Sequence, residues 1–578
     1  MSATTDPQDW IGRKVARPAI AAMGAEPDGQ PGAGDLLLVR ALARGRALEP
    51  AVERACALAL GAPARSGSAG VWLHELEAEV AAREALQALL LGSGLVEKSN
   101  PGEGALMGTS PFVIASGLLM TRRSLHWHEV IRERWRHHPD AAAQAGALAT
   151  GADAQASAVA AALRQPITVI AGGPGTGKTF TIGNLLAQAY HASPGAEPRV
   201  ALAAPTGRAA ARLTEGLSES AERHGEAREW VVRQAATTLH RLLDLRPDAT
   251  NQTGHGPDSP LPHDLVVVDE CSMVDLALMA RLISALKPDA RLVLVGDPEQ
   301  LASVEAGTVL ADLIAAAGTG GIVQRLHRRH RFGEASDVAK LADAIVAGDK
   351  AAVVGFHAPA GWIDAAGRTC WIDEGWKGRT SGWKFLAEAF RPMLKPAEAD
   401  TEAGHRESLE LLHAQRVLCL HRHGPWGSLT ANARLGQELF GSLDIARQPV
   451  AGLPVLCTRN LVALGLANGD LGVAVVRNGG LWFLFELGGR QVFLAPGQVA
   501  AWEPALAMTV HKSQGSQATH VCVLLPDEPS RLCTREALYT GVTRARSSVV
   551  VVGPRPPLEA CVDHRIRRAS VLSDWLVT

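Results

Sequence analysis

The sequence predicts an α/β protein of several domains, built mainly on two parallel β-sheets. The chain has 578 residues, which is more than one hydrophobic core can organise. After about residue 146, short apolar runs that end at small or acidic residues alternate with stretches of helical periodicity. The first four runs are ITVIAG, RVALAAP, LVVVDE and RLVLVGD. Strands that alternate with helices pair in parallel, and parallel sheets bind ligands at the carboxyl ends of their strands.

Changes of pattern divide the chain into three expected domains. Residues 1–145 carry helical periodicity without a chemical motif, so we expect a helical N-terminal domain that docks a partner. Residues 146–335 form the first α/β domain, and residues 336–578 form the second, with the runs VLCLHRH and SVVVVG as strands. Within the second domain, residues 466–505 read as hairpins that turn at NGG and GG. This pattern predicts a small inserted β-barrel.

Composition and charge exclude several classes of protein. No run of about 18 apolar residues appears and the N-terminus lacks a secretion-signal pattern, so we expect a cytoplasmic protein with no membrane span. The eight cysteines form no CxxC pair, which argues against a zinc knuckle or an iron–sulfur site. The net charge is −2, so any nucleic acid is expected to bind in a local groove rather than over the whole surface.

A phosphate-binding motif directly follows the first predicted strand. Its residues are Gly172, Gly173, Pro174, Gly175, Thr176, Gly177, Lys178 and Thr179. They lie between ITVIA and the helical stretch FTIGNLLAQAY, the strand–loop–helix context that a P-loop requires. Glycines let backbone N–H groups cradle phosphate, Lys178 can reach the β- and γ-phosphates, and Thr179 can ligate Mg²⁺. The motif predicts a site for ATP and Mg²⁺.

Polar residues at the ends of two later strands complete an expected hydrolytic site. Asp269 is placed to hold the magnesium shell, and Glu270 to orient and deprotonate the attacking water. Gln300 could sense the γ-phosphate, because a neutral amide can bond both a phosphate oxygen and a water. Taken alone, two carboxylates at a strand end are more often solvated residues than catalytic ones. The P-loop upstream favours the catalytic interpretation.

Nine sequence blocks, in this order, resemble superfamily 1 helicases of the RecD-like branch between about residues 155 and 550. They are AGGPGTGKT, APTGRAAARL, TTLHRLL, VVVDECSM, GDPEQLASVEAG, HRRHRF, NGDLGV, TVHKSQGS and YTGVTRARS. The resemblance implies two RecA-like P-loop NTPase domains with ATP between them, and an SH3-like form for the β-barrel insertion. The length and N-terminal region resemble the family's members that act as subunits of a larger complex.

The resemblance also assigns roles to single residues. Arg331 and Arg544 look like the arginines of the second domain that reach the γ-phosphate, and Gln155 is similar to the glutamine that reads adenine. Five residues fall in blocks that contact single-stranded DNA in the family: Thr206, His240, Asn468, Thr509 and His511. The chain departs from the pattern at Gln517, where the family has glutamate, and at Cys271, where alanine or serine is usual.

The family implies an ATP-dependent helicase that translocates 5′ to 3′ on single-stranded DNA. It would act at DNA ends in double-strand break repair and recombination, as a subunit of a RecBCD-type helicase–nuclease (exodeoxyribonuclease V). RecB- and RecC-type subunits would be its partners, and it would carry no nuclease site of its own. The alternatives are a stand-alone helicase of the same branch and a structural subunit that binds ATP without moving. A P-loop small-molecule kinase would have no need of the second α/β domain with its arginines.

Overall fold

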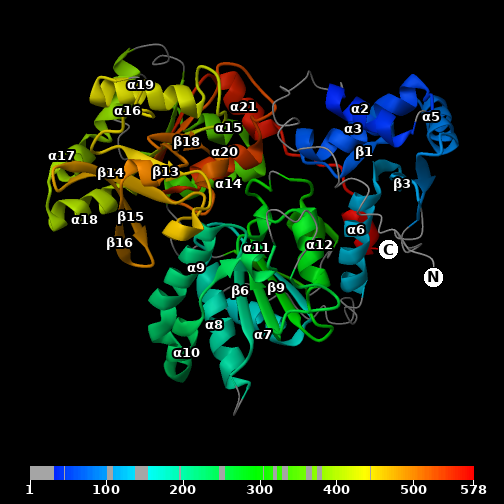
Figure 1. Cartoon of the computed structure of the whole chain (residues 1–578), viewed down its shortest axis with the longest axis horizontal. Coiled ribbons are helices and arrows are strands. Elements are labelled where there is room, and N and C mark those ends of the chain that lie inside the picture. Colours follow the sequence, from blue (N-terminus) through cyan, green and yellow to red (C-terminus); the bar gives the residue numbers. More distant parts are fainter. Residues whose placement is uncertain are drawn as a thin grey trace.

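The structure, a computed structural model, consists of three lobes that succeed one another along the chain (Figure 1). It describes residues 31–44, 46–100, 109–136, 154–193, 197–245, 254–303, 305–316, 322–327, 336–358, 368–373, 380–442 and 444–577. The N-terminal domain (blue) lies beside the first α/β domain (cyan to green), and the second α/β domain (yellow to orange) lies across the top of the first. None of the described helices is long and apolar enough to cross a membrane.

The first α/β domain contains a six-stranded, entirely parallel sheet in the order β10-β5-β9-β8-β6-β7. Its strands are β5 (Ile167–Gly172), β6 (Val200–Ala204), β7 (Thr237–Thr238), β8 (Leu265–Val268), β9 (Arg291–Gly296) and β10 (Val323–Leu326). Its helices are α7 (Ala154–Arg164), α8 (Lys178–His191), α9 (Gly207–Ser220), α10 (Arg228–Arg233), α11 (Leu239–Leu242), α12 (Leu276–Ser284) and α13 (Val309–Ala316). The four apolar runs singled out in the sequence are β5, β6, β8 and β9, so the predicted parallel sheet is confirmed. Helices cover its two faces, and this burial on both sides explains why the strands are apolar throughout.

The second α/β domain contains a five-stranded parallel sheet in the order β11-β20-β19-β12-β18. Its strands are β11 (Cys370–Ile372), β12 (Gln415–Cys419), β18 (Ala507–Thr509), β19 (Ala518–Leu524) and β20 (Ala545–Val552). Its helices are α14 (Asp337–Ala347), α15 (Lys350–Val354), α16 (Thr380–Glu388), α17 (Leu394–Glu398), α18 (Glu402–Leu411), α19 (Ser428–Phe440), α20 (Arg535–Val542) and α21 (Arg555–Asp563). A second parallel sheet therefore follows the first, as the alternating pattern predicts.

An antiparallel sheet is inserted between β12 and β18, and we call it the inserted sheet. Its strands are β13 (Pro454–Cys457), β14 (Leu471–Arg477), β15 (Gly480–Leu487), β16 (Arg490–Leu494) and β17 (Trp502–Pro504). The two predicted hairpin turns are confirmed, because Asn478 and Gly479 (φ 51° and 70°) join β14 to β15, and Gly488 and Gly489 (φ 56° and 74°) join β15 to β16. Two consecutive residues at positive φ match the twist of a tight hairpin.

The bounds predicted for the insertion, residues 466–505, need correction, and its SH3-like barrel form is not confirmed. The sheet begins earlier, at β13, and its strand order is β16-β15-β14-β13-β17. No pairing joins β16 to β17 among the described strands, so the sheet is open, with these two strands at its edges. The sequence concealed β13 because an apolar run of four residues shows neither alternation nor helical period.

The N-terminal domain is not purely helical, which corrects the expectation for residues 1–145. Its helices are α2 (Ala33–Leu42), α3 (Pro50–Ser66), α4 (Leu73–Leu76), α5 (Val80–Gly92) and α6 (Arg122–Arg136). A four-stranded sheet in the order β1-β4-β3-β2 accompanies them, formed by β1 (Gly70–Trp72), β2 (Val96–Lys98), β3 (Phe112–Ala115) and β4 (Leu118–Thr121). Strands of three or four residues are too short to show a period of two, so helical periodicity dominated the sequence pattern.

The last residues of the chain return to the N-terminal domain, and we call residues 564–577 the C-terminal tail. After α21 the tail leaves the second α/β domain, and its helix α22 (Leu572–Val577) packs against α6 and α13. Trp575 is buried with Val113, Leu118 and Met120, and its indole Nε1 donates to Ser116 Oγ at 3.0 Å. Figure 1 shows this red segment beside α6. The tail therefore completes the core of a domain that begins the chain.

Truncation of Trp575 is expected to destabilise the N-terminal domain. Trp575→Ala leaves a cavity in this core, and such a change costs about 3–5 kcal/mol. Hydrogen–deuterium exchange in β3, β4 and α6 should therefore accelerate strongly. Val577→Ala is the matched control, because Val577 is 71% exposed on the same helix and should leave exchange unchanged. Unaltered protection in Trp575→Ala would contradict a structural role for the tail.

Candidate active site at the interface of the two α/β domains

The P-loop joins the carboxyl end of β5 to the first turn of α8. Gly175 and Gly177 adopt φ of 79° and 84°, a region open to glycine, and Gly177 is the residue that precedes α8. Lys178 Nζ donates to the carbonyls of Gly172 and Gly173 at 2.8 and 3.1 Å, so its ammonium lies over the centre of the loop. A helix N-terminus preceded by such a loop suits a phosphate group. The residues present therefore fit the phosphates of a nucleotide.

Two carboxylates follow β8 and lie beside this lysine. Asp269 is buried, and its Oδ1 accepts a hydrogen bond from the backbone N–H of Glu270 at 2.8 Å. Burial and the Glu270 carboxylate raise the pKa of Asp269, while the charge of Lys178 lowers it in part. Glu270 has a φ of 50°, a strained conformation for a residue with a side chain. The chain thus aims two acidic groups at one point next to the P-loop.

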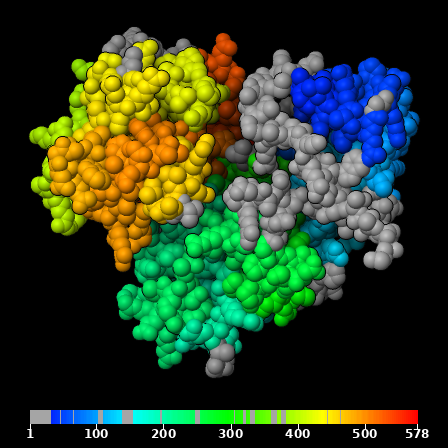
Figure 2. Space-filling view, viewed as in Figure 1, coloured from blue at the N-terminus to red at the C-terminus, as the bar shows by residue number. Residues whose placement is uncertain are grey.

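A cavity of about 540 Å³ connects these groups and draws on both α/β domains. The first domain contributes the P-loop, Asp269, Glu270 and Gln300, and the second contributes Gly515, Gln517, Arg544 and Arg546. In Figure 2 the surfaces of the two domains meet, with the inserted sheet (orange) against residues coloured teal. Because both α/β domains line the cavity, a nucleotide bound there would contact both and could change their separation.

Arg544 reaches the first domain from the segment that follows α20. Its Nη2 donates to Gln300 Oε1 at 3.1 Å, and its remaining nitrogens donate to the carbonyls of Thr540 and Ser516. Gln300 in turn donates from Nε2 to Asp297 Oδ2 at 2.9 Å. The predicted residues Gln300 and Arg544 are thus brought into direct contact across the interface. Arg331, the other arginine predicted for this site, lies outside the described residues.

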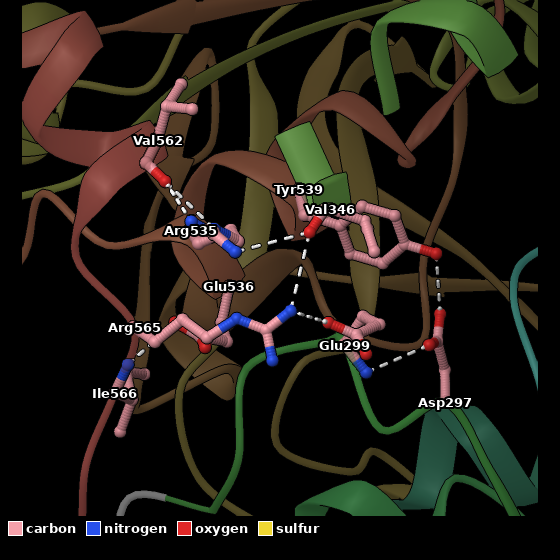
Figure 3. A network of polar contacts seen from close by, with 9 residues as sticks. All are labelled: Asp297, Glu299, Val346, Arg535, Glu536, Tyr539, Val562, Arg565 and Ile566. Atoms are coloured by element: carbon pink, nitrogen blue, oxygen red, sulfur yellow. Dashed lines mark hydrogen bonds and ion pairs between the residues drawn. The ribbon is translucent and has the colours of Figure 1, made fainter. Parts of the chain in front are cut away.

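A buried carboxylate, Asp297, anchors what we call the interdomain contact (Figure 3). Tyr539 on α20 donates its hydroxyl to Asp297 Oδ2 at 3.1 Å. The same hydroxyl lies next to the P-loop, since a Cβ built on Gly173 would be 3.1 Å from the Tyr539 hydroxyl oxygen. The backbone N–H of Glu299 donates to Asp297 Oδ1 at 3.1 Å, while its side chain pairs with Arg565 of the tail. Asp297 is therefore bonded by residues of both domains.

Other hydrogen bonds extend this contact on both sides. Thr540 Oγ1 accepts from the backbone N–H of Leu301 at 2.9 Å, and Gln514 Nε2 donates to the carbonyl of Leu301 at 2.7 Å. Thr540, Gln514 and Leu301 are all buried, where a polar group is costly to leave without a hydrogen bond. The segment after β9 is therefore fixed to two separate segments of the second domain.

The predicted adenine-reading residue lies next to the P-loop. Gln155 Nε2, in the first turn of α7, donates to the carbonyl of Thr176 at 3.2 Å. The hydroxyl of Thr176 donates to the carbonyl of Gly173 at 2.9 Å, which closes the loop on itself. Thr179 lines the cavity one residue after Lys178. Gln155, Thr176 and Thr179 thus lie together at the P-loop, and their predicted contacts with the nucleotide stay predictions.

Four of the five residues predicted to contact DNA lie at or just after the carboxyl ends of parallel strands, and the fifth, Asn468, lies in a loop. Thr206 follows β6 and His240 follows β7, its parallel neighbour, so both lie at one edge of the first sheet. Thr509 ends β18 and His511 follows it, at the corresponding edge of the second sheet. Asn468 is exposed in the loop before β14. The carboxyl-end edges of the two parallel sheets therefore both carry polar side chains that could contact DNA.

Two of these segments touch across the interface. Arg208 Nη1 donates to the carbonyl of Gly469 at 3.5 Å, and a Cβ built on Gly207 would lie 2.7 Å from Cβ of Ala467. Thr206 also has a structural role, since its hydroxyl accepts from the N–H of Ala209 and caps α9. Thr509 Oγ1 similarly accepts from the N–H of Lys512 at 3.4 Å.

Sequence reasoning missed several residues of the site. Tyr539 stands inside the block YTGVTRARS, and the fact that the chain has only two tyrosines could have drawn attention to it. Arg212 and Arg546 line the cavity but were hidden among many arginines. Gln517, the departure from the family pattern, accepts a hydrogen bond from Arg546 Nε at 3.4 Å. A neutral amide thus stands where a carboxylate would have neutralised this arginine.

Two family models match the chain. The model described as an AAA domain matches residues 150–368, and the model described as a UvrD-like helicase C-terminal domain matches residues 504–552. Among solved structures, the Pif1 helicase from Bacteroides in complex with ADP-AlF3 and ssDNA has 14% sequence identity and a TM-score of 0.38, covering 70% of this chain and 92% of that one.

Curated relatives are much more similar. The chain is 42% identical over 438 residues to the RecBCD enzyme subunit RecD of Mycolicibacterium smegmatis, covering 73% of this chain and 74% of that protein. It is 32% identical to RecD of Haemophilus influenzae, covering 73% and 72%. It is 31% identical to the ATP-dependent RecD2 DNA helicase of Deinococcus radiodurans, covering 67% of this chain but 47% of that protein. By identity and coverage, the chain belongs to the RecD family of RecBCD enzyme subunits.

Proposed function

We propose that this chain is a motor that uses ATP hydrolysis to move 5′ to 3′ along single-stranded DNA, as a subunit of a RecBCD-type helicase–nuclease. Membership in the RecD family makes it an ATP-dependent DNA helicase. The observation that carries the proposal is the cavity shared by the two α/β domains, with Lys178 on one side and Arg544 on the other. A site divided in this way can convert a change in nucleotide into a change in domain separation.

The first domain supplies the groups for hydrolysis. Lys178 holds the β- and γ-phosphates, and Thr179 with Asp269 holds the shell of Mg²⁺, which neutralises phosphate charge when bound. Glu270 orients the attacking water and accepts its proton. Gln300 bonds the γ-phosphate or the water, and this role requires it to release Arg544 or to share its amide between both partners.

The second domain supplies the arginines. Arg544 reaches the cavity from across the interface, and by resemblance Arg331 acts with it. A planar guanidinium that bonds phosphoryl oxygens stabilises the charge of the transition state, so hydrolysis depends on domain closure. Single-stranded DNA would lie along the strand edges that carry Thr206, His240, Asn468, Thr509 and His511. Alternating grip by the two edges would advance the strand.

We propose RecB- and RecC-type partners in a heterotrimer, with the region up to about residue 145 as the docking domain. We favour a subunit of a complex over a stand-alone helicase because the chain aligns with 74% of the length of the Mycolicibacterium smegmatis RecD but with only 47% of the length of the RecD2 helicase. The proposal includes action at DNA ends in double-strand break repair and a cytoplasmic location. A silent structural subunit is disfavoured because Lys178, Glu270, Gln300 and Arg544 all meet at one cavity.

ATP hydrolysis should depend on single-stranded DNA and on Lys178. Lys178→Gln removes the charge that holds the β- and γ-phosphates, and we expect a loss of at least about a hundredfold in DNA-stimulated turnover. The measurement is steady-state hydrolysis by the full chain, alone and with RecB- and RecC-type subunits. Hydrolysis that ignores DNA in both preparations would contradict the motor.

Direction can be tested by displacement of streptavidin from biotinylated oligonucleotides. A motor that moves 5′ to 3′ pushes toward the 3′ end, so streptavidin on a 3′ biotin should be released faster than streptavidin on a 5′ biotin. Glu270→Gln is the matched control, since this variant should bind ATP and DNA but displace streptavidin from neither biotin. Faster release from the 5′ biotin would reverse the proposed polarity.

The hydroxyl of Tyr539 should couple the two domains. Tyr539→Phe removes one donor from the buried Asp297, at a cost of about 1 kcal/mol, and we expect DNA-stimulated kcat to fall about fivefold with little change in the KM for ATP. Tyr190→Phe changes the chain's other tyrosine, which packs on Trp230, and should leave kcat unaltered. Equal kcat values in both variants would show that the hydrogen bond between Tyr539 and Asp297 does not couple the two domains during turnover.

A further inference from the structure

Three arginines line the cavity in addition to Arg544, and their surroundings differ. The guanidinium of Arg223 lies 5.5 Å from the ring centre of Phe180, and Arg546 donates to Gln517. Arg212 makes no hydrogen bond and no ion pair with any residue in the described part of the chain. It therefore differs from Arg544 and Arg546, because no described residue forms a hydrogen bond or an ion pair with its guanidinium.

The helix that carries Arg212 faces the end of the P-loop where the γ-phosphate belongs. Helix α9 buries Leu213 and Leu217 in the first domain, and it packs beside α8 (Figure 1). Arg212 and Gly216, one turn apart, both line the cavity. A Cβ built on Gly216 would lie 2.8 Å from Cγ2 of Thr179, so this face of α9 lies directly against the predicted magnesium ligand.

The electrostatic surroundings of Arg212 call for an anion. Burial lowers the pKa of Arg212, the charge of Arg544 lowers it further, and Glu270 opposes them. A half-buried guanidinium without a hydrogen-bonded partner among the described residues has lost part of its hydration without replacement, and an anion placed between Arg212 and Arg544 would offset both this loss and the repulsion. Each nitrogen of the Arg544 guanidinium already donates one hydrogen bond, to Thr540, Ser516 or Gln300, and two of its five N–H groups remain for an anion.

We propose that Arg212 is a γ-phosphate-binding residue supplied by the first α/β domain, which senses the triphosphate before the arginines of the second domain engage. This inference rests on the proposed ATP site and adds a residue to it. Because Arg212 belongs to the same domain as the P-loop, its contact forms whether the two domains are open or closed. Its contribution is therefore to ground-state binding of the triphosphate, and a diphosphate would not reach it.

The test is nucleotide affinity rather than turnover. Binding of fluorescent methylanthraniloyl derivatives of AMPPNP and of ADP, with Mg²⁺, is titrated by anisotropy on the full chain. Loss of a charge-assisted hydrogen bond corresponds to roughly a tenfold or greater change in Kd. We expect Arg212→Gln to weaken AMPPNP binding by about tenfold or more while the Kd for ADP stays within about twofold. Arg212→Lys, which keeps the charge, should lose less than Arg212→Gln.

Matched controls separate this role from others. Arg233→Gln removes an arginine that pairs with Glu197 on the surface of the same domain, and should change neither Kd. Circular dichroism melting checks that each variant folds. Equal weakening of both nucleotides in Arg212→Gln, or no weakening of AMPPNP, overturns the inference and leaves the proposed function intact. Failure of the wild-type chain to bind either nucleotide would overturn both.

Discussion

The buried carboxylate of Asp297 connects the nucleotide site to the relation between the two α/β domains. It accepts hydrogen bonds from Gln300 and the Glu299 backbone in the first domain and from Tyr539 in the second. Burial raises the pKa of Asp297, and the Lys178 charge with these donors lowers it. Tyr539 and Gln300 donate to the same oxygen of Asp297, so a movement of the second domain that removes the Tyr539 donor changes the bonding of the oxygen that Gln300 also uses.

The cavity and the C-terminal tail constrain how the second α/β domain could move relative to the first. Arg212 and Lys178 belong to the same domain, so the proposed domain motion would leave their separation unchanged, whereas it would move Arg544 together with α20. The tail limits this motion from the other side, because Arg568 is bonded to the carbonyls of Ser303, Glu305 and Gly307, and α22 is packed into the N-terminal domain. In the proposed motor, the two α/β domains would open at the cavity while the tail keeps the second domain joined to the N-terminal domain.

The sequence predicted the parallel strands, the P-loop and the two hairpin turns, because each has a strong local signal: unbroken apolar runs, a glycine pattern at fixed spacing, and Asn-Gly or Gly-Gly pairs. It did not predict β13 or the sheet of the N-terminal domain, where strands of three or four residues are set by long-range pairing. Tyr539 and Arg212 were missed for the same reason. Their importance comes from partners distant in the chain, such as Asp297 for Tyr539 and Thr179 beside the helix of Arg212.

The central claim is that the γ-phosphate sets the separation of the two α/β domains. All eight native cysteines are buried, so cysteines introduced at the exposed positions Val232 on α10 and Leu429 on α19 can be labelled selectively. Energy transfer between a donor and an acceptor at these positions is measured on the full chain with single-stranded DNA. The account predicts a shift to shorter distances with AMPPNP and Mg²⁺ and a return to longer distances with ADP. An identical distance distribution with both nucleotides would contradict it.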